Sequence, residues 1–381
     1  TARPASAAPA GADAEPTAGL LALLRDYLQF HWSVRRRLAR PDAAAGPPPD
    51  RLLIYRCTAL GFCGGHGDRL NGIFGVLLLA IASGRAFFID APRPVPLHLV
   101  LGPRICGDAC RALLGEGSEF LLDWRLHGAV ALSGRQVNYN DRYNDVVADL
   151  PWLLAEEREP VVVLHSNQRV SGAVLQSSVA QGRLGPVAGA LLSTPFLHAE
   201  LFRVLFQPTP LLAGRAAEVQ AASRAGRARL LAVHFRAGDR SPQRWKDPPR
   251  HALSDLEAFL ACAAAAEKRL GWADDEAAWY LAADTAQVAG SQAIEALRGR
   301  GKLAFLPAGH GDASIIHLDR SPMDAAVVGL TETWAQWLTI AAADAAVLSA
   351  SNFGVTAAEA GRVPHTFLGA AGCVASETFA T

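Results

Sequence analysis

Apolar residues along the chain fall into short runs that alternate with longer stripes at helical spacing. Continuous runs at 52–56, 85–90, 279–284 and 345–348 predict buried strands, because four to eight apolar residues in a row fit a strand covered on both faces. A further run of small apolar residues ends at His234-Phe-Arg236 and predicts another strand. Strands of this kind are typical of parallel sheets.

Helical stripes separate these strands. The nearly all-apolar stretch 73–82 and the Ala-rich stretch 355–361 predict helices, and the bulky residues between Thr333 and Ala341 recur at the spacing of one buried helix face. Thr333 with Gln336 predicts a capping box at the start of that helix. Near the amino end, 20–38 predicts one more helix.

The alternation predicts an α/β protein built from two Rossmann-type domains that face a central cleft. A length of 381 residues exceeds the roughly 250–300 that one core supports. We expect a low-complexity tail and linker with one helix over 1–50, an N-terminal domain over 51–215 and a C-terminal domain over 216–381.

Polar residues gather where the predicted strands end. His234, Arg236 and Asp239 follow one strand, and the fork of an arginine matches a phosphate or diphosphate. Asp284 ends another strand, where its carboxylate accepts hydrogen bonds from a base such as guanine or caps the next helix. Open α/β sheets bind ligands at these strand ends, so the residues predict a nucleotide site.

Two helix starts add candidate anion sites. The loop Gly61 to Gly72 joins the 52–56 strand to a helix, and Ser349-Ala-Ser351-Asn352-Phe353-Gly354 precedes another helix. N–H groups at a helix start bind anions. Glycines can also serve only to make a tight turn, and Ser or Asn only to cap a helix.

Taken in order over about residues 51–370, these motifs resemble the GDP-fucose fucosyltransferase superfamily, which includes protein O-fucosyltransferases, xyloglucan fucosyltransferases and α1,6-fucosyltransferases. The resemblance implies a GT-B-like fold, GDP-fucose as donor, a glycan or protein hydroxyl as acceptor, inversion at the anomeric carbon, and no cofactor or metal. It also implies the lumen of the Golgi or endoplasmic reticulum, with any anchor outside this chain.

The same resemblance assigns the site residues. Arg236 would stabilise the leaving GDP, Asp68 would act as general base, and His66 is the alternative proton acceptor. The donor-binding residues would be Gly65, Gly67, Arg69, Asn71, His234, Asp239, Asp284, Ser349, Ser351, Asn352, Phe353 and Gly354.

Two other functions compete with this interpretation. The Gly65-x-Gly67 turn, followed by Asp90 at the end of the next strand, imitates the fingerprint of an NAD or FAD enzyme. Leu70 stands where that fingerprint needs its third glycine. A non-catalytic protein that binds a nucleotide sugar on the same fold is the second alternative.

Charge and cysteine content narrow the remaining classes. A formal net charge of +0 gives no electrostatic reason to expect a nucleic-acid partner, and charges at Arg25 and Asp26 interrupt the 20–38 helix as a membrane span. Of the six cysteines, Cys57 with Cys63 and Cys106 with Cys110 could close small disulfide loops, whereas nothing in their spacing indicates a zinc site.

Overall fold

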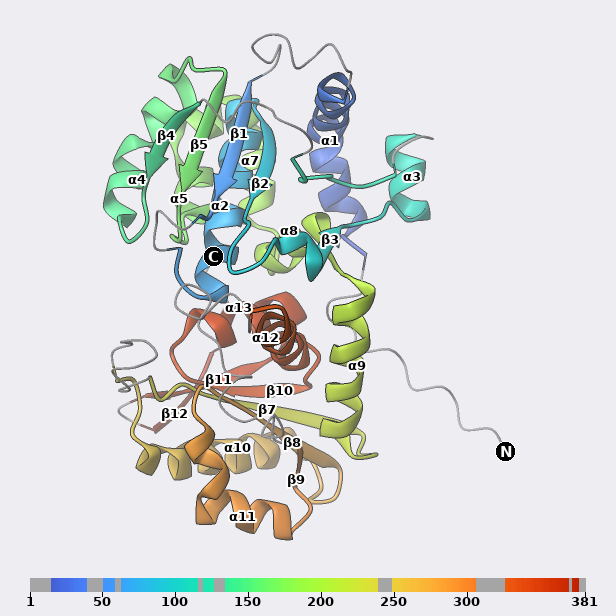
Figure 1. Cartoon of the computed structure of the whole chain (residues 1–381), viewed down its shortest axis with the longest axis vertical. Coiled ribbons are helices and arrows are strands. Elements are labelled where there is room, and N and C mark those ends of the chain that lie inside the picture. Colours follow the sequence, from blue (N-terminus) through green and yellow to red (C-terminus); the bar gives the residue numbers. More distant parts are fainter. Residues whose placement is uncertain are drawn as a thin grey trace. The chain divides into compact units, whose positions relative to one another are not determined.

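Two units of the chain each build their own sheet. The computed structural model describes residues 15–39, 51–58, 63–115, 119–126, 134–238, 249–305, 326–369 and 372–376. The N-terminal unit runs from Glu15 to Gln207, and the C-terminal unit begins at Pro208 (Figure 1). The division falls a few residues before the expected 215, because α9 (Pro210–Arg224) packs on strands of the C-terminal sheet.

The N-terminal sheet has four parallel strands. Their order is β2 (Ala86–Asp90), β1 (Leu52–Arg56), β5 (Val161–His165) and β4 (Arg135–Asn138). The predicted bounds of β1 are correct, and β2 begins one residue later than expected. A small second sheet pairs β3 (Leu101–Pro103) with β6 (Phe206–Pro208).

Two long helices cover opposite faces of the four-stranded N-terminal sheet. Val34 of α1 (Ala18–Leu38) shares a buried cluster with Leu52 and Ile54 of β1, whereas α2 (His66–Ser83) packs beside Tyr55, which points the other way. The segment expected to be a tail with one helix therefore contributes core. The other helices are α3 (Asp108–Leu114), α4 (Tyr143–Pro151), α5 (Ser171–Gln176), α6 (Ser178–Leu184), α7 (Pro186–Leu192) and α8 (Leu197–Leu205).

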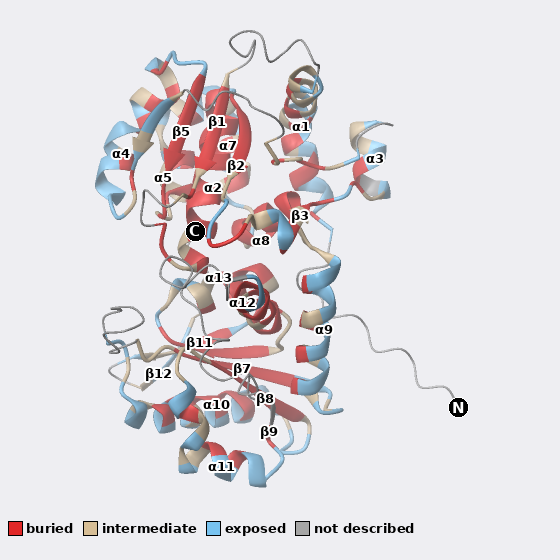
Figure 2. Cartoon of the chain, viewed as in Figure 1, coloured by how far each residue is buried: buried red, intermediate tan, exposed pale blue. Residues whose placement is uncertain are grey.

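The C-terminal sheet has six strands, of which only the edge strand β12 is antiparallel. The order is β12 (Gly372–Ala375), β11 (His365–Gly369), β10 (Ala345–Leu348), β7 (Arg229–Phe235), β8 (Ala277–Ala283) and β9 (Leu303–Phe305). The central strands β7, β8 and β10 are buried over nearly their whole length, whereas the edge strand β12 is largely exposed (Figure 2).

Helices cover both faces of the C-terminal sheet. The helices α10 (Leu256–Leu270) and α11 (Gln292–Gly299) lie on one face, and α9, α12 (Ala326–Ala341) and α13 (Asn352–Gly361) lie on the other (Figure 1). The chain leaves β7 toward α10 and leaves β10 toward α13. The strand order therefore reverses between β7 and β10, and open α/β sheets bind ligands at such a reversal.

The predicted capping box in α12 is wrong. The helix is already formed at Ala326, and the Thr333 hydroxyl donates to the carbonyl of Gly329 one turn earlier, at 2.7 Å. A threonine hydroxyl in a helix interior bonds back to the preceding turn in this way. The Thr-x-x-Gln spacing therefore lies inside a helix rather than at its start.

All six cysteines form disulfides. Cys57 pairs with Cys63 and Cys106 with Cys110, as their spacing allowed. Cys262 of α10 pairs with Cys373 of β12 across a separation of 111 residues, which the sequence did not reveal. Within the described residues, no helix is both long enough and apolar enough to cross a membrane.

The contact between α2 and the segment after β5 gives a direct test of the packing. A Cβ at Gly72 would lie 1.8 Å from the carbonyl oxygen of Ser166, so Gly72→Ala has to push backbone apart. We expect a loss of about 2 to 3 kcal/mol in the free energy of unfolding, measured by urea denaturation. The control is Gly182→Ala in α6, where no atom lies within 4 Å of the added methyl group. Equal stability of the two variants would contradict this packing.

Candidate active site

The carboxyl ends of β7, β8 and β10 bring three predicted site residues together. The register pairs Phe235 with Ala283 and His234 with Leu348, so the residues that follow these strands meet at one edge of the sheet. This places Arg236, Asp284 and Ser349 side by side. The site is therefore built at the strand reversal between β7 and β10.

Asp284 holds the segment that follows β7. One carboxylate oxygen accepts the N–H of Ala237 at 2.8 Å, and the other accepts the N–H of Gly238 at 3.0 Å. The second oxygen also lies 3.4 Å from Nη1 of Arg236, and the carboxylate is nearly buried. Gly238 has a φ of +75°, the left-handed region that glycine adopts without strain. The carboxylate therefore positions both the turn and the guanidinium, which the sequence did not show.

Ser349 joins β10 to β7. Its hydroxyl donates to the carbonyl of His234 at 3.0 Å and accepts the N–H of Arg236 at 2.8 Å, and its own N–H donates to the same carbonyl. The side chain is buried. The hydroxyl fixes the backbone of Arg236, and the predicted contact of Ser349 with the donor stays a prediction.

His234 is buried against the start of α13. Its ring lies 5.3 Å from that of Phe353, and a Cβ at Gly354 would fall 2.7 Å from its Nδ1. Gly354 is therefore required for this close approach. Burial, followed by the nearby charge of Arg236, lowers the pKa of His234 to about 3, so the ring is neutral at pH 7.

The first turn of α13 contributes backbone donors. Ser351 is its N-cap residue in an extended conformation, and its side chain makes no capping hydrogen bond. Asn352 is exposed and Phe353 half-buried. The first N–H groups of a helix have no partner within the helix, and they carry the positive end of its dipole. The turn therefore has donors that suit an anion, and the predicted contact of this segment with the donor stays a prediction.

The glycine loop in the N-terminal unit is used differently. Gly64 has a φ of +76°, and the N–H of Gly65, the N-cap residue of α2, donates to Oδ2 of Asp68 at 2.8 Å. Asp68 thus caps the helix on which it lies. Gly67 is buried in the first turn. That Asp68 also acts as general base stays a prediction.

Three other predicted residues of this loop lie in the interior. Arg69 donates from Nε to the carbonyl of Gly64 at 3.2 Å and from Nη1 to the carbonyl of Arg93, so it holds two backbone segments together. Asn71 is 1% exposed inside α2. His66 is also buried, which lowers its pKa well below the usual range. Their predicted contacts with donor or acceptor stay predictions, and Asp239 lies outside the described residues.

Two features disfavour the dinucleotide alternative. The carboxylate of Asp90, which would bind a ribose, is 2.7 Å from Nε of Arg56 on the neighbouring strand and forms an ion pair with it. Leu70, at the place of the third glycine, is buried in the core. The glycine loop is thus the start of a capped helix rather than a dinucleotide fingerprint.

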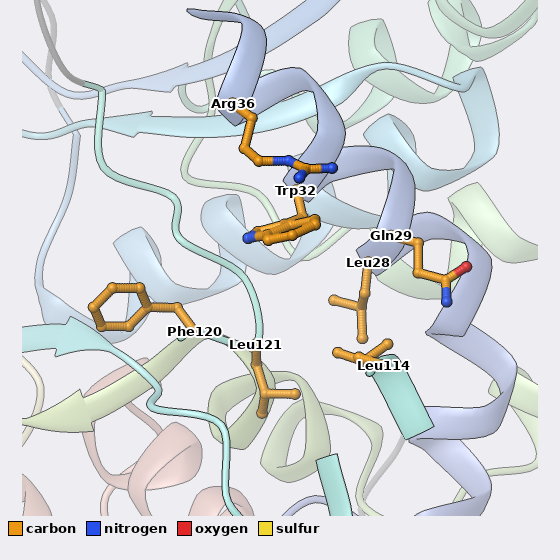
Figure 3. A pocket seen from close by; sticks show the side chains of 7 residues that line it. All are labelled: Leu28, Gln29, Trp32, Arg36, Leu114, Phe120 and Leu121. Atoms are coloured by element: carbon orange, nitrogen blue, oxygen red, sulfur yellow. The ribbon is translucent and has the colours of Figure 1, made fainter. Parts of the chain in front are cut away.

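A pocket of about 240 Å³ lies elsewhere in the N-terminal unit (Figure 3). The guanidinium of Arg36 stacks 3.7 Å above the ring of Trp32, and the rest of the lining is mostly apolar, from Leu28, Leu114, Phe120 and Leu121. It contains none of the predicted site residues. A second pocket of about 310 Å³, on the α10 and α11 side of the C-terminal unit, contains none either. The candidate site therefore rests on the strand ends.

Comparisons with known proteins place the fold. No family model and no curated protein matches the sequence. A mutant of Arabidopsis thaliana FUT1, solved in complex with GDP, is similar in structure over 96% of this chain and 84% of its own, with 14% identity and a TM-score of 0.63. NodZ, an α1,6-fucosyltransferase from Bradyrhizobium co-crystallised with GDP, is similar over 84% and 95%, with 14% identity and a TM-score of 0.50.

The chain has the fucosyltransferase fold. This confirms the GT-B-like α/β class that the ordered motifs implied. Within this fold, the C-terminal unit carries Arg236, His234 and the start of α13 at its strand reversal. Both of these solved structures contain GDP.

Titration of His234 makes the stability of the fucosyltransferase fold depend on pH. Its pKa is about 3 when folded and about 6.5 when unfolded, so between these values only the unfolded chain binds this proton. The contribution of His234 to the free energy of unfolding is fully present above pH 6.5. Below that pH it falls by up to about 1.4 kcal/mol per pH unit. His234→Gln should flatten the slope measured by urea denaturation from pH 7 to 4. The exposed His98 gives the control, and His98→Gln should keep the wild-type slope.

The cap on α2 is tested separately. Asp68→Ala removes the acceptor of the Gly65 N–H and should cost about 1 kcal/mol in the free energy of unfolding, whereas Asp68→Asn keeps an acceptor oxygen and should lose less. Asp108→Ala, in the exposed first turn of α3, is the control and should be near neutral. Wild-type stability in Asp68→Ala would contradict the cap.

Proposed function

We propose that this protein is a glycosyltransferase that transfers fucose from GDP-fucose to a hydroxyl acceptor, with inversion and without a metal. One observation carries the proposal: Asp284 holds the guanidinium of Arg236 at the strand reversal, next to the start of α13. A fixed guanidinium and aligned N–H groups are what a diphosphate leaving group needs. Fucosyltransferases of the same fold bind GDP.

The reaction breaks the bond between the anomeric carbon and the β-phosphate oxygen. The bonding electron pair stays on GDP, while an acceptor hydroxyl oxygen forms a new bond to the opposite face of the same carbon. Its proton passes to a base, for which Asp68 remains our candidate. Negative charge thus grows on the diphosphate in the transition state, and Arg236 with the N–H groups of α13 stabilises it there.

The geometry changes the roles proposed for individual residues. We assign Asp284 to position Arg236 and the 237–238 backbone, because its oxygens accept the N–H groups of Ala237 and Gly238. Its predicted contact with guanine stays a prediction. His234 packs its Nδ1 edge against Gly354, and we propose that Nε2 is the atom that contacts the donor. A neutral ring can donate or accept there without opposing the charge of Arg236.

The disulfides indicate the redox environment in which the protein works. Pairing of all six cysteines is typical of an oxidising environment, since cytosolic thiols are kept reduced. We propose that the protein works in the lumen of the secretory pathway.

Substitution of Arg236 tests the donor role. Arg236→Ala should lower turnover about a hundredfold or more, because an anion-stabilising donor is lost, and Arg236→Lys should not restore it, because a point charge cannot reproduce the fork. The measurement is transfer of labelled fucose from GDP-fucose, together with GDP affinity by calorimetry.

Arg298→Ala, on the exposed side of α11, is the matched control and should leave both quantities unchanged. NAD, tested as a ligand beside GDP, should not bind. Binding of NAD without GDP, or full activity of Arg236→Lys, would contradict the proposal. GDP binding without any transfer would leave a nucleotide-sugar binding protein.

A further inference from the structure

The pocket of about 240 Å³ in the N-terminal unit is built mainly on one stripe of α1 (Figure 3). Leu28, Trp32 and Arg36 follow one another at intervals of four residues, so their side chains share one face of the helix. Leu114 of α3 and the segment 120–121 supply the rest of the apolar wall. The lining thus comes from three segments that are far apart in the sequence.

The indole of Trp32 separates a cation from this apolar wall. The guanidinium carbon of Arg36 lies 3.7 Å from the centroid of the indole, a stacked arrangement. Figure 3 shows the guanidinium on one side of the indole and three leucines, Leu28, Leu114 and Leu121, on the other. Leu28 and Leu121 are almost fully buried. The second face of the indole is therefore turned toward a fixed apolar floor.

Arg36 has no acidic partner among the described residues. Its neighbours Arg35 and Arg125 both form ion pairs with the carboxylate of Asp123, at 2.8 Å each. The side chain of Arg36 is exposed, and its one described interaction is the stack on the indole. The described lining of the pocket contains no acidic residue either. Three guanidinium groups around one carboxylate leave this surface positive, with one cation available to a ligand.

The stacked guanidinium is a preorganised contact for an anion. Stacking on Trp32 restricts the rotamers of Arg36, so less conformational entropy is lost when an anion binds. The planar fork can donate two parallel hydrogen bonds to one carboxylate. Gln29, which is exposed and lines the same pocket, adds an amide group. A single unpaired cation suits one anionic group, whereas a polyanion or an anionic membrane is bound by several cations together.

The volume and the lining select the rest of the ligand. A cavity of about 150 Å³ already binds benzene, so a pocket of about 240 Å³ holds one ring with a short arm. Leucine side chains and the faces of Trp32 and Phe120 offer nothing to the hydroxyl groups of a sugar. An aromatic ring, in contrast, packs against such a lining through its face and its edge.

We propose that this pocket binds a small aromatic carboxylate. The ring packs between Trp32 and the leucines, and the carboxylate, on its short arm, passes the edge of the indole and pairs with Arg36. The pocket shares no residue with the candidate active site, so this proposal does not depend on the proposed transfer reaction.

Binding of 3-phenylpropionate to the full chain is the main test. Saturation-transfer NMR measures it, and we expect a dissociation constant of about 1 mM, which is ordinary for so small a ligand. Three comparison compounds each lack one feature: 3-phenylpropanol lacks the charge, propionate lacks the ring, and galacturonate carries its carboxylate on a polar ring. Each should bind about tenfold more weakly or worse, because one class of contact is lost.

Two variants connect the binding to this pocket. Arg36→Gln removes the charge of an exposed side chain, so it should weaken 3-phenylpropionate about tenfold and leave 3-phenylpropanol unchanged. Arg25→Gln, at an exposed arginine of the same helix, is the matched control and should bind as wild type does. Trp32→Leu keeps an apolar side chain but removes the indole, and it should weaken both compounds. The melting temperature of each variant checks that it is folded.

The outcomes decide the proposal in every case. Absence of saturable binding of 3-phenylpropionate overturns it, and so does wild-type affinity in Arg36→Gln. Equal affinity for 3-phenylpropionate and 3-phenylpropanol overturns the charge selection, and tighter binding of galacturonate would indicate a sugar pocket instead. Loss of 3-phenylpropionate binding in Arg36→Gln but not in Arg25→Gln, with GDP affinity unchanged in both, supports the pocket.

Discussion

The hydrogen bonds accepted by Asp284 are the interaction on which the candidate site depends. One nearly buried carboxylate binds two successive backbone N–H groups and the guanidinium of Arg236. A buried charge is tolerated only when it is paired and hydrogen-bonded, and this one meets both conditions. By doing so it fixes a cation at the edge of the sheet, where an unrestrained arginine would adopt many rotamers and pay entropy on binding.

The surrounding contacts serve the same preorganisation. Ser349 ties the backbone of Arg236 to β10, and the absence of a side chain at Gly354 lets α13 begin directly against His234. Each is a small residue at a point where a larger one would separate two elements. The positive end of α13 and the guanidinium are thereby held without a ligand, so that a diphosphate would meet donors already in place.

In the N-terminal unit, the polar groups at the helix start and at the strand ends are paired with other groups of the same unit. Its glycine loop serves its own helix through Asp68, and its strand ends neutralise their charges in the pair of Arg56 with Asp90. The C-terminal edge also pairs an arginine with an aspartate, Arg236 with Asp284, and what it has in addition is the start of α13.

The sequence by itself determined the class of fold and most elements near the site. Continuous apolar runs located β1 and β10, and the ordered strand-end motifs indicated the fucosyltransferase fold, because local hydrophobic pattern records whether a strand is covered on both faces. What only the tertiary structure decided was the partner of each polar group. The sequence placed Asp284, Ser349 and Asp90 at strand ends, but it did not show the protein groups that each of them contacts on a neighbouring strand or the segment after it. The disulfide between Cys262 and Cys373 likewise joins two segments that lie 111 residues apart in the chain. Strand order is set by contacts between residues far apart in the chain, so no local spacing could reveal these pairings.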